Sequence, residues 1–128
     1  MLMVAQVREY PMCRIVVVHD GDTLRLDADL GFSVHAYVWV RLKDVRAPEL
    51  SEGEPGQAAK AAVVNWQQSY APDGGYVRLT TFQVETIEKE IHEQRTFIRY
   101  VGIVQPLNGA DPGLNDFMRA LGYTHQGI

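Results

Sequence analysis

The sequence predicts an α+β fold in a single domain of residues 1–128, a five-stranded β-barrel of the OB type that carries two α-helices. Three observations lead to this prediction. The chain has five short runs that are rich in β-branched residues or alternate in polarity, which is typical of strands. Runs with helical spacing follow the third and the fifth of them, and Gly, Pro and acidic residues separate the elements. Five strands with helices in these two places fit an OB barrel.

The first three predicted strands should form a curled antiparallel meander, because the connections between them are short. The first strand consists of residues 5–10 and 13–18, and Pro11 between them suits an edge or a kink. Residues 23–27 alternate in polarity, as a strand with one buried face should. After a turn at Gly31 we expect the third strand at residues 32–42.

Two segments have apolar side chains at helical spacing. The first should begin after Pro55-Gly56, which ends a polar loop, and residues 71–75 should stop it. Gly122 should close the second helix. The apolar positions are Ala59, Val63, Trp66 and Tyr70 in the first helix and Leu114, Phe117, Met118 and Leu121 in the second.

The remaining two strands lie between the helices. We expect them at residues 76–84 and 97–104, where β-branched and aromatic residues gather. Residues 85–94 are strongly charged. This segment is either a turn between the two strands or a short protruding hairpin.

The composition is that of an ordinary globular chain, with 46% apolar and 22% charged residues. No apolar run reaches the roughly 18 residues of a membrane span, and the N-terminus lacks the pattern of a signal peptide. The single cysteine, Cys13, excludes an internal disulfide and fits a reducing compartment. We therefore expect a cytoplasmic protein without an organic cofactor, of a size that suits a phage or a bacterium.

The net charge bears on the kind of partner. It is −4, with a pI near 5.5, whereas tight sequence-independent binders of nucleic acid are usually basic. A nuclease needs positive charge only where it holds the phosphate. The charge therefore predicts weak or metal-assisted binding of nucleic acid rather than none.

Two charged stretches follow apolar strand runs. One is His19-Asp20-Gly21-Asp22-Thr23, after residues 15–18, and the other runs from Arg41 to Glu49, after residues 36–40. Each predicted strand stops where these charges begin. Where two such strand ends meet, their acids and arginines can form a site for a cation and a phosphate.

The order of four blocks in this chain resembles that of the staphylococcal nuclease family. The blocks are Asp20-Gly21-Asp22-Thr23 after a strand, Arg41-Leu42 with Val45 and Pro48-Glu49, Arg99 in an apolar strand, and residues 114–118 before Leu121-Gly122-Tyr123. The resemblance runs from about Cys13 to Tyr123. It implies the same barrel and a metal-dependent endonuclease, or phosphodiesterase, that cleaves DNA or RNA with one hard cation, typically calcium.

The resemblance also implies roles for individual residues. Asp22 matches a metal ligand, and Asp20 matches an acid that supports the metal site from behind. Glu49 matches the general base, and Arg41 and Arg99 match the two arginines that clamp the phosphate. Taken without the resemblance, Asp22 suits a turn aspartate and Glu49 a solvated loop glutamate. The two arginines, each between apolar residues of a strand, favour function.

The chain departs from the family at the metal site. Arg46 stands where the family has its second metal-ligating aspartate, and Ala47 stands where a backbone carbonyl ligates. Replacing −1 by +1 near a divalent ion changes the interaction by roughly 10 kcal/mol before screening, so metal affinity should fall by orders of magnitude. Asp44 can replace the missing metal-ligating aspartate if the strand bulges near Lys43. Alternatively, Asp44 forms an ion pair with Lys43 or Arg46 at the surface. A third reading puts Arg46 in the cation's place, against substrate.

Three further expectations complete the analysis. Arg95 can replace a lysine that the family has before its second arginine, and Phe97 either stacks on a base or belongs to the core. Family members have a further C-terminal helix that this chain lacks, so one flank of the barrel should be exposed, or covered by a second copy or a protein partner. The alternative to a nuclease is therefore a catalytically weak or inactive domain that binds nucleic acid or a protein.

Overall fold

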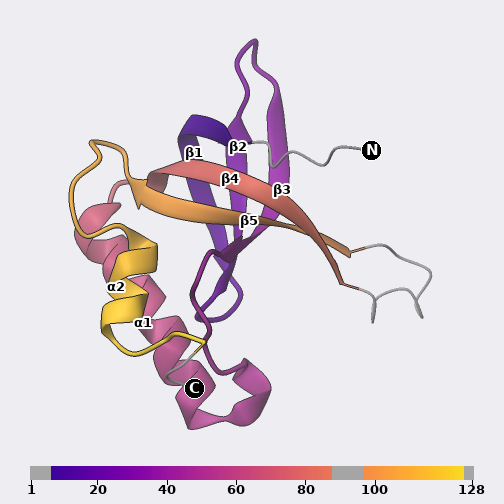
Figure 1. Cartoon of the computed structure of the whole chain (residues 1–128). Helices are drawn as coiled ribbons and strands as arrows, with labels where there is room; N and C mark the ends of the chain where they lie inside the picture. The colour runs from indigo at the N-terminus through magenta and orange to yellow at the C-terminus, as the bar shows by residue number, and fades with distance from the viewer. Residues whose placement is uncertain (1–6, 88–96, 126–128) are drawn as a thin grey trace.

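A computed structural model describes residues 7–87 and 97–125 of the chain. Within them, five strands close into a barrel in the order β1-β2-β3-β5-β4, and two α-helices lie together on one side of it (Figure 1). This confirms the predicted α+β barrel of the OB-like class with two helices. The elements are β1 (Arg8–Val18), β2 (Thr23–Asp29), β3 (His35–Leu42), the 3₁₀ helix η1 (Leu50–Glu52), α1 (Glu54–Tyr70), β4 (Tyr76–Ile87), β5 (Phe97–Pro106) and α2 (Leu114–Ala120).

The strand pairing confirms the predicted meander and adds its closure. β1 pairs with β2 and β2 with β3, both antiparallel. β3 then pairs in parallel with β5, so that Trp39 lies beside Arg99 and Arg41 beside Val101. Antiparallel pairing of β4 with both β5 and β1 completes the barrel.

β1 is one continuous strand, so Pro11 does not divide it in two, but an irregularity is present at Pro11, where we expected an edge or a kink. The register of β1 against β4 shifts there, between Tyr10 and Cys13. A second shift, between Ile15 and Val17, occurs against β2. Such bulges bend a strand, which lets β1 pair with both of its neighbours around the closed barrel.

Two other boundaries differ from the prediction. β3 begins at His35 rather than at residue 32, because Gly31, Phe32 and Ser33 have φ angles of 85°, 55° and 63° and form a left-handed turn. α1 begins at Glu54, ahead of Pro55-Gly56. Proline is tolerated in the first turn of a helix, where its missing N–H would have no partner in any case.

β4 and β5 extend beyond their predicted ends and form a long antiparallel hairpin. Glu85 pairs with Arg99 and Ile87 with Phe97 in this hairpin. We expected the charged segment to be either a turn or a protruding hairpin, and its residues 85–87 form part of a hairpin. Residues 88–94 lie outside the described residues.

The core fills the barrel and the space between it and the helices. Leu24 and Leu26 of β2 and Val40 and Leu42 of β3 are wholly buried, and Trp66 of α1 is buried as deeply. The indole Nε1 of Trp66 donates a hydrogen bond to the Pro112 carbonyl (3.0 Å), which ties α1 to the segment before α2. The largest buried side chains are Leu24, Leu26, Leu42, Leu79, Leu114, Met118 and Trp66. No helix in the described residues is long and apolar enough to cross a membrane.

The buried face of α2 differs from its predicted apolar stripe. Leu121 lies past the end of the helix and is exposed, whereas the polar Asn115 is buried. The Asn115 side chain accepts a hydrogen bond from the Val104 N–H and donates to the carbonyls of Lys43 and Gly102, each at 3.0 Å. Asn115 therefore fixes α2 to the ends of β3 and β5.

Candidate functional site

The turn between β1 and β2 carries the Asp-Gly-Asp-Thr motif. The backbone N–H groups of His19 and Asp20 both donate to the Thr23 carbonyl, at 3.0 and 3.3 Å, and the Asp20 carboxylate accepts from the Asp22 N–H at 3.1 Å. A Cβ added at Gly21 would lie 2.6 Å from the Cβ atoms of Ala47 and Ala59. Gly21 is therefore needed for close approach, since it lets the turn pack directly against α1.

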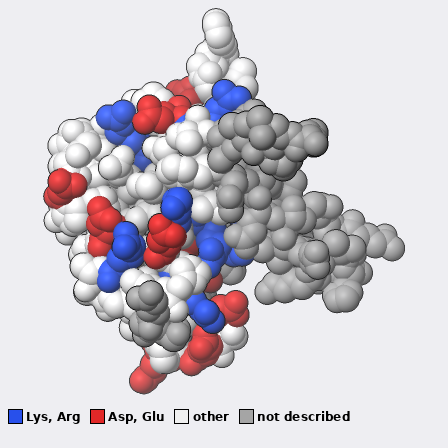
Figure 2. Space-filling model, in the orientation of Figure 1, with Lys and Arg blue, Asp and Glu red and all other residues white. Residues whose placement is uncertain are grey.

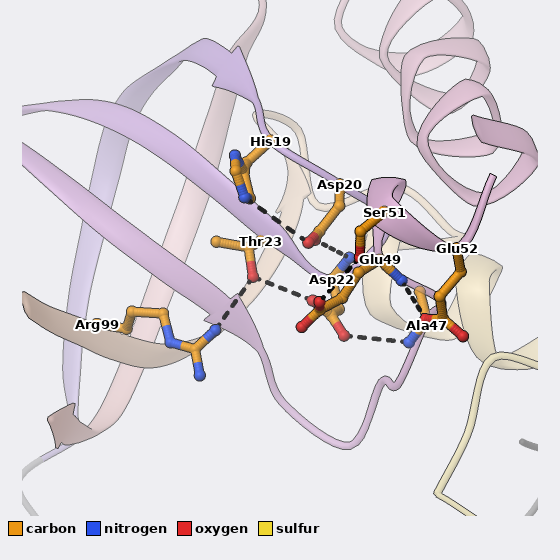
Figure 3. A network of polar contacts seen from close by, with 9 residues as sticks. All are labelled: His19, Asp20, Asp22, Thr23, Ala47, Glu49, Ser51, Glu52 and Arg99. Atoms are coloured by element: carbon orange, nitrogen blue, oxygen red, sulfur yellow. Dashed lines mark hydrogen bonds and ion pairs between the residues drawn. The ribbon is translucent and has the colours of Figure 1, made fainter. Parts of the chain in front are cut away.

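Asp22 joins the two charged stretches. It is half-buried, and its Oδ1 accepts a hydrogen bond from the Thr23 hydroxyl (3.0 Å) while its Oδ2 accepts from the Ala47 N–H (3.1 Å; Figure 3). The resemblance led us to expect the Ala47 carbonyl at a cation. The group of Ala47 that faces Asp22 is instead its N–H. Both carboxylate oxygens of Asp22 thus already accept one hydrogen bond.

Thr23 connects Asp22 to the predicted phosphate clamp. Its hydroxyl accepts a hydrogen bond from Arg99 Nη1 at 3.4 Å while it donates to Asp22. Arg41 lies directly opposite Thr23 in the β2–β3 pairing. The neighbouring Leu24 and Leu42 point into the core, so Thr23 and Arg41 lie on the outer face of the barrel. Asp22 and Arg99 thus meet at Thr23, and Arg41 is the cross-strand neighbour of Thr23. We did not single out Thr23, although it belongs to the motif.

Glu49 lies between Pro48 and η1, and its position depends on α1. Its backbone N–H donates to the Glu52 carboxylate (2.7 Å), and its own carboxylate, on an exposed residue, accepts from the Ser51 hydroxyl (3.5 Å). A Cβ added at Gly56 would lie only 2.0 Å from the Glu49 carbonyl oxygen. Figure 3 shows Asp20, Asp22 and Glu49 together on one side of Thr23, with Arg99 reaching it from the other.

Asp20 is the buried acid of the site, with 7% of its surface exposed. Burial, and after it the neighbouring Asp22 side chain, raise the pKa of Asp20 from 3.8 to about 6. His19 Nε2 lies 4.0 Å from the Asp20 carboxylate. At neutral pH the site therefore carries a buried negative charge directly behind Asp22.

The residues that distinguish this chain from the family lie at the edge of the site. Arg46 is exposed, and its backbone N–H donates to the Tyr123 carbonyl (3.1 Å). Asp44 has a φ of 60°, and its carboxylate pairs with Lys43 Nζ at 3.0 Å. Of the alternatives for Asp44, the structure thus has the pairing with Lys43. No group of three or more His, Cys, Asp or Glu side chains in the described part of the chain is placed to hold a metal ion.

Two predicted substrate-binding residues cannot be placed. Arg95 lies outside the described residues. Phe97 is the first residue of β5, opposite Ile87, and its side chain also lies outside what the structure describes.

Comparison with models of known protein families, with curated proteins and with solved structures found no match to this chain. The resemblance to staphylococcal nuclease therefore rests on the motif residues alone. The structure itself assigns the chain to the class of closed five-stranded, OB-like barrels with two helices.

Proposed function

We propose that this chain is a phosphodiesterase of the staphylococcal nuclease type that hydrolyses DNA or RNA. The observation that carries the proposal is the hydrogen-bonded path from Asp22 through Thr23 to Arg99. Arg41 lies opposite Thr23 in the sheet, so both arginines of the motif belong to the same outer surface. Residues far apart in the sequence thus lie close together on this surface, which supports the proposal.

Each group at this surface has a chemical task in the proposed reaction. The guanidinium groups of Arg41 and Arg99 suit a phosphate, because their planar forks donate two parallel hydrogen bonds and neutralise charge at phosphorus. The Glu49 carboxylate is on an exposed residue next to the site, so it can accept a proton from an attacking water. The hydroxyl of Thr23 fixes Arg99 relative to Asp22.

A divalent cation would add positive charge at the phosphate, and the donor set fits only a weakly held one. Calcium takes six to eight oxygen ligands, whereas the residues proposed to hold it supply one carboxylate, that of Asp22. Each Asp22 oxygen retains a further lone pair beyond its hydrogen bond. We therefore propose that Asp22 holds calcium together with water and substrate oxygens, and that Arg46 lowers the affinity.

The charges on the molecular surface agree with modest substrate affinity. Figure 2 shows Lys and Arg side chains interspersed with Asp and Glu on the face in view, rather than gathered into one basic patch. Non-specific affinity for nucleic acid depends on the number of phosphates that Lys and Arg neutralise. Binding should thus depend on the phosphate site itself.

Digestion of single-stranded and plasmid DNA, and of RNA, with calcium and with chelator tests the proposal. Glu49→Gln keeps the size of the side chain and removes the base, so cleavage should fall at least a hundredfold. Glu54→Gln, an exposed glutamate in the first turn of α1, is the matched control and should cleave like the unchanged protein. If the unchanged protein and Glu49→Gln are equally inert with several metals, the proposal is wrong.

A second function is favoured by the hydrogen bonds of Asp22. Because the Ala47 N–H already occupies one Asp22 oxygen and Arg46 adds positive charge nearby, the same surface can bind nucleic acid without cleaving it. Salt-dependent binding of an oligonucleotide that Arg41→Ala weakens, with no cleavage under any condition, would identify this function.

A further inference from the structure

Next to the proposed phosphate site, the outer face of β2 and β3 carries a group of rings and a guanidinium. We call it the aromatic strip, and it consists of His19, Arg25, Tyr37 and Trp39. Arg25 and Trp39 are direct neighbours in the β2–β3 pairing, and Trp39 is in turn the neighbour of Arg99 in the β3–β5 pairing. The strip therefore continues the surface of the phosphate clamp across three strands.

Ring contacts, rather than acids, hold Arg25 in place. Its Cζ atom lies 5.3 Å from the ring centroid of Trp39 and 5.9 Å from that of Tyr37, within the range of cation–π attraction. The next acid on this face of β2, Asp27, accepts a hydrogen bond from His35 Nδ1 (2.8 Å). Within the described part of the chain, no carboxylate pairs with Arg25, so its positive charge is not neutralised by a neighbouring acid.

The rings of the strip are accessible and ordered relative to one another. Tyr37 is 56% exposed, and 59% of the His19 side chain is exposed. The His19 ring stands edge-on to the Trp39 ring, with centroids 5.8 Å apart and planes at 80°. An exposed tyrosine, a half-buried tryptophan and a planar guanidinium on one face offer flat surfaces to a flat ligand, whereas an ordinary solvated strand would offer charged or hydroxylic side chains.

We propose that the aromatic strip stacks the bases of a single-stranded nucleic acid whose phosphate lies at Arg41 and Arg99. This inference rests on the proposed function. Bases in a single strand can leave the stack and pack on aromatic rings or on a guanidinium plane. In a duplex the same base faces are covered by neighbouring base pairs. The chain has a net charge of −4, but three arginines, Arg25, Arg41 and Arg99, lie on this face. Their positive charge favours a polyanion over an apolar protein segment as the ligand.

Tryptophan fluorescence in chelator, where a metal-dependent reaction cannot proceed, tests this proposal directly. Trp66 is wholly buried and Trp39 half-buried, so quenching by a ligand should report on Trp39. The probes are a thymidine oligonucleotide, a duplex of equal length and thymidine 3′,5′-bisphosphate. The single strand should quench the fluorescence and the duplex should not. Trp39→Phe should remove the signal.

Substitutions at two positions of the strip, the exposed Tyr37 and the half-buried Arg25, separate stacking from folding and from general charge. Tyr37→Ala and Arg25→Gln should each weaken binding of the oligonucleotide by about tenfold, as expected for losing one stacked base, and weaken binding of the bisphosphate, which has a single base, by less. Tyr76→Ala and Arg78→Gln, exposed residues of β4, are the matched controls and should bind the oligonucleotide like the unchanged protein. Thermal melts verify that all four variants fold.

The proposal is overturned if Tyr37→Ala and Arg25→Gln bind the single strand as tightly as their controls, or if the duplex competes equally. It is also overturned if the unchanged protein binds no oligonucleotide at low salt, which would favour a protein partner for this face. Failure of the proposed hydrolysis has a different outcome. The unchanged protein and Glu49→Gln would then be equally inert, while Tyr37→Ala and Arg25→Gln would still bind the oligonucleotide more weakly.

Discussion

The first turn of α1 contacts the backbone of Glu49 so closely that Gly56 has no room for a side chain. A Cβ at Gly56 would lie 2.0 Å from the Glu49 carbonyl oxygen and 2.9 Å from the Leu50 Cα. Similarly, a Cβ at Gly21 would meet Ala59 in the same helix at 2.6 Å. α1 thus sets the position of both charged stretches, the one with Asp22 and the one with Glu49.

Gly56→Ala should therefore displace the proposed base. In an open helix position this change stabilises by about 1 kcal/mol, but here overpacking should destabilise by about 1–3 kcal/mol. A shift of about 1 Å at Glu49 should lower cleavage by up to a hundredfold. Urea denaturation and cleavage rates measure the two effects. Gln57→Ala, its exposed neighbour, should change neither; a fully active Gly56→Ala variant would show that α1 does not position Glu49.

Thr23→Val removes the hydroxyl that joins Asp22 to Arg99 and keeps the shape of a buried side chain. We expect about tenfold weaker binding of a nucleotide bisphosphate, because Arg99 loses its hydrogen bond to the Thr23 hydroxyl. The free energy of unfolding should fall by only about 1 kcal/mol. Thr23→Ser keeps the hydroxyl and should restore binding. Equal affinities for Val and Ser at this position would mean that the hydroxyl does not orient Arg99.

The raised pKa of Asp20 predicts how stability depends on pH. With a pKa of about 6 in the folded state and about 3.8 in the unfolded state, the native protein binds more protons between these values. Its stability should therefore fall as pH rises from about 4 to about 6, by at most about 3 kcal/mol from this group. Asp20→Asn can still accept the hydrogen bond from the Asp22 N–H, and it removes the buried charge.

Urea denaturation at two pH values checks this expectation. Asp20→Asn should be more stable than the unchanged protein at pH 8 and no more stable at pH 3.5. Asp73→Asn, in an exposed loop, should show no such difference. Equal stability of Asp20→Asn and the unchanged protein at pH 8 would refute the buried-charge account.

Arg46→Asp should recover cation binding. It replaces a positive by a negative charge one residue before Ala47, whose N–H contacts Asp22. Calcium affinity, measured by calorimetry, should rise at least tenfold, and cleavage should become more dependent on calcium. Arg78→Asp makes the same change of net charge on β4 and should leave both unchanged. The same calcium response in both variants would place the cation site elsewhere.

Much of the fold is predictable because local patterns and the tertiary structure agree. The alternation in β2 and the spacing of Ala59, Val63 and Trp66 in α1 match the faces that are buried. The start of β3 was not predictable, since Phe32 and Ser33 adopt positive φ angles that side chains other than glycine rarely take. Asn115 was missed because a polar residue is buried only where tertiary partners satisfy it, and its partners come from β3 and β5.

The candidate site was partly predictable for a similar reason. The order of the motifs predicted that Asp22, Arg41, Glu49 and Arg99 belong to one site, because strand ends that adjoin in a small barrel bring such residues together. The sequence does not reveal that the Ala47 N–H donates to Asp22, since this depends on the backbone conformation between Arg46 and Ala47. The contact of Gly56 with Glu49 was equally hidden, because it depends on how α1 packs.

A crystal structure with thymidine 3′,5′-bisphosphate and calcium tests the central claim most directly. The account predicts one phosphate within hydrogen-bonding distance of both Arg41 and Arg99, with the Glu49 carboxylate facing its phosphorus. A phosphate bound elsewhere, or one that contacts neither arginine, would contradict it.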